Sequence, residues 1–106
     1  MNNKLDILLK GLSDVKWHYN DSDPIQRCLK LCKCVDDAVI LWREWFPERR
    51  VEYQFKFEYV PYRLTIFYRE YSSTSYETFK YDIEFEEDGS LRIDKEEGLF
   101  NVFGHM

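Results

Sequence analysis

Apolar and polar residues alternate along most of the second half of this chain, in three long runs and one short run that together span residues 51–94. A period of two, rich in aromatic and β-branched residues, is typical of strands with one buried and one solvated face. The inward positions of the four runs are Val51, Tyr53, Phe55, Phe57 and Tyr59; Tyr62, Leu64, Ile66 and Tyr68; Phe79, Tyr81, Ile83 and Phe85; and Leu91 and Ile93. The alternation therefore predicts a four-stranded antiparallel meander.

The same pattern predicts how the strands pair, because opposite residues share a face and a slip of one residue would bury charges. Matching the apolar faces sets Phe57 against Leu64 and Ile66 against Tyr81. A three-residue hairpin loop at 87–89, with glycine at its left-handed position, completes the register. In this register, charges of alternating sign form one outward row across the four strands: Glu58, Arg63, Glu84 and Arg92.

Two amphipathic helices are expected before the sheet. The segment Ser22-Asp23-Pro24 is a typical helix start, and Pro47 ends the helix. Its apolar stripe has spacings of three and four, as in a helix that faces a core: Cys28, Cys32, Val35, Val39, Trp42 and Phe46, widened by Leu29, Leu31, Cys34, Ala38 and Trp45. A shorter helix reaches about Leu12, and residues 13–21 are left undecided between helix and a short edge strand.

The expected fold class is α+β. In one domain over residues 1–106, a helical layer (1–47) packs on one face of a four-stranded antiparallel β-meander of order 1-2-3-4 (50–95), as a two-layer sandwich. An apolar tail follows over residues 98–106 and is expected to dock on the helix or the sheet. A homodimer through this tail or through the exposed first strand stays an open alternative.

The charge of the chain is uneven. Its net charge is −5, and residues 82–97 carry eight acidic and two basic side chains, whereas residues 1–50 are nearly balanced. This bias argues against direct binding of nucleic acid, where phosphates call for basic surfaces. No stretch is apolar enough to span a membrane, and no signal peptide is visible. Three cysteines within one helix indicate a reducing compartment, so we expect a cytoplasmic protein.

The motifs of the chain favour a protein without catalytic activity, metal or cofactor. The spacing of Cys28, Cys32 and Cys34 does not suit a zinc site, so we interpret them as packed thiols. His18 and His105 are the only histidines, and neither lies in a sequence context that favours a catalytic pair. The numerous carboxylates fall on a wet strand face, and the four glycines form no phosphate-binding loop.

The register leaves aromatic residues outward beside the acidic strands, a composition that is common at protein interfaces. The expected partner-binding residues are Asp82, Glu84, Glu86, Glu87, Asp88 and Asp94, with Phe67, Arg69 and Tyr71 as anchors. We interpret the chain as a small acidic protein-binding module for a partner with a basic surface. An inhibitor or immunity-type protein of bacterial or phage origin, directed at a nuclease or another nucleic-acid-handling protein, fits this description.

The alternative function is binding of a small molecule between the long helix and the sheet. Five tyrosines occupy inward positions, and buried hydroxyl groups need hydrogen-bond partners: Tyr53, Tyr59, Tyr62, Tyr68 and Tyr81. A bound molecule would be one such partner.

Overall fold

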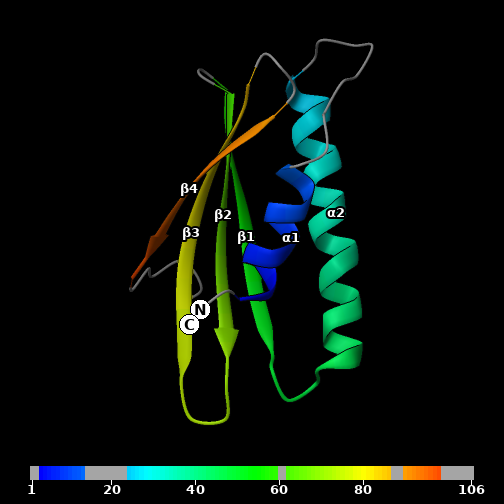
Figure 1. Cartoon of the computed structure of the whole chain (residues 1–106), viewed down its shortest axis with the longest axis vertical. Coiled ribbons are helices and arrows are strands. Elements are labelled where there is room, and N and C mark those ends of the chain that lie inside the picture. The colour runs from blue at the N-terminus through cyan, green and yellow to red at the C-terminus, as the bar shows by residue number, and fades with distance from the viewer. Residues whose placement is uncertain (1–2, 14–23, 60–61, 87–89, 99–106) are drawn as a thin grey trace.

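The computed structural model describes residues 3–13, 24–59, 62–86 and 90–98, which form two helices followed by four strands. The helices are α1 (Lys4–Ser13) and α2 (Pro24–Trp45), and the strands are β1 (Val51–Tyr59), β2 (Tyr62–Tyr71), β3 (Tyr76–Phe85) and β4 (Leu91–Glu97). Both helices lie on the same face of the sheet (Figure 1). The predicted α+β class with a helical layer on one sheet face is therefore confirmed.

Helix α1 begins with a reciprocal cap that its sequence encodes. The side chain of Asn3 accepts the backbone N–H of Asp6 at 2.8 Å, and the carboxylate of Asp6 accepts the backbone N–H of Asn3 at 3.2 Å. This arrangement satisfies two backbone donors that a helix start leaves open. Leu5 and Leu9, four residues apart, then bury one face of α1 against the sheet.

Helix α2 runs from Pro24 to Trp45 and ends two residues before Pro47, the residue that was predicted to end it. The buried residues of its core-facing side follow spacings of three and four: Cys28, Leu31, Val35 and Val39. The predicted cap at Ser22 and Asp23, and the undecided segment after Ser13, lie outside the described residues. None of the helices in the described part of the chain is both long and apolar enough to cross a membrane.

The four strands form one antiparallel sheet of order β1-β2-β3-β4. The predicted register is confirmed on every strand pair, with Phe57 opposite Leu64, Ile66 opposite Tyr81, and Ile83 opposite Ile93. A backbone hydrogen bond of 2.9 Å from Glu86 to Ser90 closes the last hairpin. Its loop at 87–89 lies outside the described residues, as does the apolar tail after Gly98.

The core lies between the helical layer and the inner face of the sheet. Ile66, Tyr68, Tyr81 and Ile83 are buried at its centre. The width predicted for the apolar side of α2 was wrong, because Leu29 is 56% exposed and Trp45 is 63% exposed. Helix α1 has 10 residues and α2 has 22, so α1 cannot flank α2 along its whole length.

Candidate functional site

The predicted partner-binding residues that the structure describes share the outer face of the sheet, which neither helix covers (Figure 1). Phe67 on β2 lies opposite Lys80 on β3, and Asp82 on β3 lies opposite Asp94 on β4. Glu87 and Asp88, which belong to the same prediction, lie outside the described residues. Six of the remaining members form two groups at different places along the strands, and Phe67 lies between these groups.

The first group is the acidic cluster, which we define as Asp82, Glu84, Glu86 and Asp94. Glu84 contacts two arginines, with Arg92 at 2.6 Å and Arg63 at 3.5 Å, so most of the predicted charge row forms ion pairs. Arg92 also lies 3.9 Å from the carboxylate of Glu86. Part of the acidic charge is therefore already balanced by neighbouring strands, and a partner meets less of it than the composition indicates.

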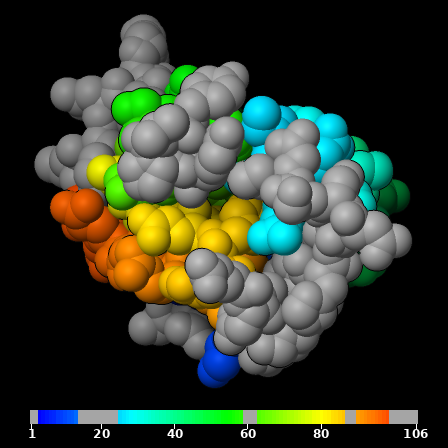
Figure 2. Space-filling view, turned by 90° about the horizontal axis from the view of Figure 1, so that it is seen from above, coloured from blue at the N-terminus to red at the C-terminus, as the bar shows by residue number. Residues whose placement is uncertain are grey.

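Asp82 and Asp94 make the other half of the acidic cluster. They lie directly opposite each other on β3 and β4, an arrangement of like charges that costs stability in a sheet. Asp82 accepts a hydrogen bond of 2.7 Å from Thr65 and has Lys80 at 3.8 Å, whereas the side chain of Asp94 is exposed. The end of β3 and the start of β4 reach the surface side by side at the end of the molecule where α2 begins (Figure 2).

The second group lies at the β2–β3 hairpin and contains two of the predicted anchors, Arg69 and Tyr71. The guanidinium of Arg69 lies 4.4 Å from the ring centre of Tyr76, and that of Arg50 lies 4.4 Å from the ring centre of Tyr71. Arg69 pairs with Thr78. Thr78 precedes Asp82 by four residues on β3, so the hairpin group lies about 13 Å from Asp82 along the strand. Arg69 and Tyr71 do not form one continuous patch with the acidic cluster.

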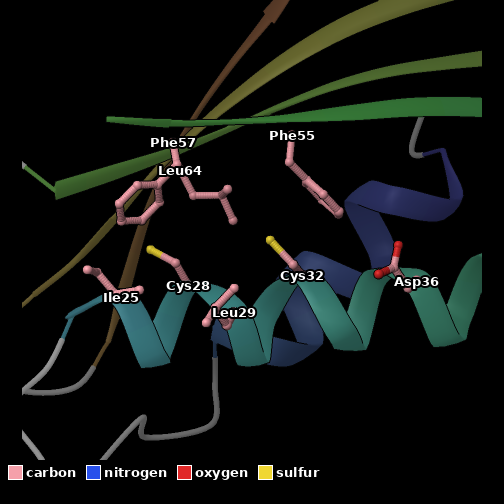
Figure 3. A pocket seen from close by; sticks show the side chains of 8 residues that line it. All are labelled: Ile25, Cys28, Leu29, Cys32, Asp36, Phe55, Phe57 and Leu64. Atoms are coloured by element: carbon pink, nitrogen blue, oxygen red, sulfur yellow. The ribbon is translucent and has the colours of Figure 1, made fainter. Parts of the chain in front are cut away.

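A cavity of about 370 Å³ lies between α2 and the sheet, and we call it the helix–sheet cavity (Figure 3). Helix α2 lines it with side chains from four successive turns: Ile25, Cys28, Leu29, Cys32 and Asp36. The strands add three apolar side chains: Phe55, Phe57 and Leu64. The sulfur atoms of both cysteines point toward the sheet side of the cavity. Exposed Leu29 lies at its rim.

The two thiols of the cavity are poor nucleophiles. Burial, with a smaller contribution from the neighbouring Cys32, raises the pKa of Cys28 to about 12. Burial and the nearby Asp36 raise the pKa of Cys32 to about 11. Because the thiolate is the reactive form, neither group is poised for nucleophilic catalysis near neutral pH. The thiols line the cavity as neutral, polarisable groups.

Protein carboxylates accept hydrogen bonds from the inward tyrosines whose side chains the structure describes. Tyr53 donates to Asp36 at the edge of the cavity, Tyr68 donates to Glu70 at 2.7 Å, and Tyr81 donates to Asp6 at 2.7 Å. Burial and these bonds raise the pKa of each hydroxyl, to about 12 for Tyr53. Their hydroxyls therefore give no argument for a ligand, and the case for one depends on the cavity itself.

Sequence reasoning missed an apolar groove between the two helices, which we call the interhelical groove. It has a volume of about 390 Å³, and its lining includes Ile7 of α1, which is 62% exposed, and Trp45 of α2. Ile7 lies off the Leu5–Leu9 stripe, which was the signal available in the sequence. Exposed apolar patches of this kind are common at protein interfaces.

Within the described residues, no three side chains among histidine, cysteine, aspartate and glutamate gather in a way that suits a metal ion. His18 and His105 lie outside these residues. Comparisons with protein families, with characterised proteins and with solved structures found no match to this chain.

Proposed function

We propose that this chain is a non-enzymatic protein-binding module that docks its acidic cluster on a basic surface of another protein. An inhibitor or immunity-type role toward a nuclease or another nucleic-acid-handling protein fits this chemistry, because such targets carry basic surfaces for phosphates. The observation that carries the proposal is the set of carboxylates at β3 and β4 on the sheet face opposite the helices, two of which, Asp82 and Asp94, oppose each other.

The pairing of Asp82 with Asp94 supports the proposal on energetic grounds. Like charges on opposite strands destabilise a sheet by an amount comparable to the few tenths to about 1 kcal/mol that a favourable pair contributes. A lysine or arginine of a partner placed between the two carboxylates would remove that repulsion. The residues also lie on paired strands, so their positions are fixed before binding and little conformational entropy is lost.

The experiment compares two variants with the same change in net charge. Asp82→Asn, Glu84→Gln and Asp94→Asn together neutralise three of the four carboxylates of the acidic cluster, and the control neutralises three exposed carboxylates in and just after the second half of α2: Asp37, Glu44 and Glu48. A partner is captured with the wild-type chain and identified, and its affinity for all three proteins is then measured at low and high salt. We expect the cluster variant to lose at least tenfold in affinity and most of the salt dependence, with little loss in the control. Equal affinities for the two variants would refute the acidic cluster as the docking surface.

The helix–sheet cavity supports a second candidate function, the binding of a small molecule. Its volume of about 370 Å³ and its largely apolar lining fall within the usual range for ligand sites. Binding of apolar probe molecules to the purified chain tests this candidate independently of any protein partner.

A further inference from the structure

We infer that the helix–sheet cavity selects an apolar amine, with its hydrocarbon or aryl part between α2 and the sheet and its ammonium group at Asp36. This inference rests on the second candidate function and goes further by naming the ligand chemistry. It depends on three observations about the cavity: its apolar walls, its uncharged thiols and the single carboxylate among its described lining residues.

The walls of the cavity suit the hydrocarbon or aryl part of a ligand. Phe55 and Phe57 project from β1 toward α2 (Figure 3), and Ile25 and Leu29 of the helix add to the apolar lining. Strand β1 is an edge of the sheet, and Phe55 and Phe57 are only partly buried although they occupy inward positions. A hydrocarbon chain in this cavity would remove their remaining apolar surface from water, at about 25 cal/mol for each Å² covered.

Among the lining residues that the structure describes, Asp36 is the only one with a carboxyl group, and none has a basic side chain. The high pKa values of Cys28 and Cys32 keep both thiols protonated. An anionic head group, as in a fatty acid, would therefore meet a carboxylate of the same sign and no compensating cation among the described lining residues. A cationic head group would meet the opposite charge.

The hydrogen bonds around Asp36 leave room for a donor. Tyr53 donates to its Oδ1 atom, and within the described residues its Oδ2 atom accepts no hydrogen bond. Arg43, about two turns further along α2, donates to the backbone carbonyl of Val51 at 3.3 Å and lies 6.0 Å from the ring centre of Tyr53. An ammonium group near Oδ2 would form a charge-assisted hydrogen bond, which is stronger than one between neutral groups.

The test uses octylamine, octanoate and octanol, which share a chain and differ in the head group, with affinities from NMR titration of the full chain near pH 7. Octylamine is a cation at this pH because alkyl ammonium groups resemble lysine, whose pKa is about 10.4. We expect octylamine to bind at least tenfold more tightly than octanoate. Asp36→Asn keeps an acceptor for Tyr53 and should reduce that ratio to less than threefold, with octanol unaffected. The matched control Asp37→Asn, at an exposed residue paired with Lys33, should keep the full ratio.

The outcomes separate the inference from the function on which it rests. If all three compounds bind with equal affinity, the preference for amines is refuted and the ligand cavity stands. If none binds, both are refuted. A second measurement does not rely on variants: octylamine should slow alkylation of Cys32, which lines the cavity, and leave the rate for Cys34, which does not, unchanged. Equal rates for Cys32 with and without octylamine would also count against the inference.

Discussion

Replacing Asp6 by alanine is expected to destabilise the fold by about 2 to 4 kcal/mol, although the residue lies in the first turn of a short helix. The side chain of Asp6 is only 14% exposed, and it joins α1 to two strands. Its carboxylate accepts hydrogen bonds of 2.7 Å from Tyr81 on β3 and 2.7 Å from Lys95 on β4. It also accepts the backbone N–H of Asn3 in the cap.

The magnitude follows from the groups that would lose a partner. The hydroxyl of Tyr81 is buried, and a buried donor left without an acceptor costs about 1 to 3 kcal/mol. Loss of the cap bond adds about 0.5 to 1 kcal/mol, and loss of the bond from Lys95 adds less than about 1 kcal/mol because Lys95 can turn to water. Asn3 still donates to the Tyr81 hydroxyl at 2.9 Å, which keeps that group partly satisfied.

Urea unfolding at pH 7, followed by tryptophan fluorescence, measures the effect, with Asp37→Ala as the control. The side chain of Asp37 is 61% exposed and, among the described residues, pairs with Lys33 on its own helix, so its removal should cost less than about 0.5 kcal/mol. In combination with Tyr81→Phe, the cost of Asp6→Ala should fall by about 1 kcal/mol or more, because the two groups share a hydrogen bond. Equal costs for Asp6→Ala and Asp37→Ala would refute the reasoning.

The contacts of Asp6 also predict that the stability of the fold depends on pH. Burial alone raises the pKa of Asp6, but the hydrogen bonds from Lys95, Tyr81 and the backbone of Asn3 outweigh it and leave the pKa below its ordinary value of 3.8. A depressed pKa in the folded state means that the stabilisation is complete above the ordinary value and is lost as pH falls through the folded value. The difference in stability between wild type and Asp6→Ala should therefore be constant above about pH 5 and shrink below about pH 4. A difference that stays constant down to pH 2 would contradict the assignment.

Three further predictions use simpler measurements. Ile66→Ala removes a buried side chain from the centre of the sheet and should cost about 2 to 5 kcal/mol in urea unfolding. Glu84→Ala breaks two partly exposed ion pairs and should cost about 0.5 to 1 kcal/mol in the same assay, an effect that shrinks at high salt. The alkylation rate of Cys32, followed by mass spectrometry, should rise about tenfold for each pH unit between pH 7 and 9, because its pKa is about 11.

The sheet was predictable because a strand pattern with charges on alternate residues permits few pairings. Moving β2 by one residue against β1 would place Arg63 and Arg69 on the inner face, so the register follows from the cost of burying charge. The number of residues between two strands does not affect this reasoning, because the register of each pair of neighbouring strands follows from the side chains of that pair alone. The pairing of Ile66 with Tyr81 was inferred in this way and is confirmed.

The helical layer was less predictable, because periodicity gives the direction of a side chain and not the neighbour it meets. Val35 and Trp45 both belong to the apolar arc of α2, yet Val35 is fully buried and Trp45 is 63% exposed. The same limit applies to the polar contacts of the core. Nothing in the sequence connects Asp6 with Tyr81, which is 75 residues away, or marks Asp36 as the acceptor of Tyr53.

The acidic cluster shows why a count of charges differs from the charge that a partner meets. Arg92 is 57% exposed and contacts both Glu84 and Glu86, so a basic partner would compete with it for the same carboxylates. Replacing Arg92 by glutamine should therefore lower stability by no more than about 1 kcal/mol while strengthening the binding of a basic partner several-fold. Binding of an oligolysine peptide, measured by calorimetry at two salt concentrations, provides the test, with Arg43→Gln as a control for net charge alone. Equal gains for both variants would mean that the peptide responds to the overall charge of the chain and not to the carboxylates that Arg92 occupies.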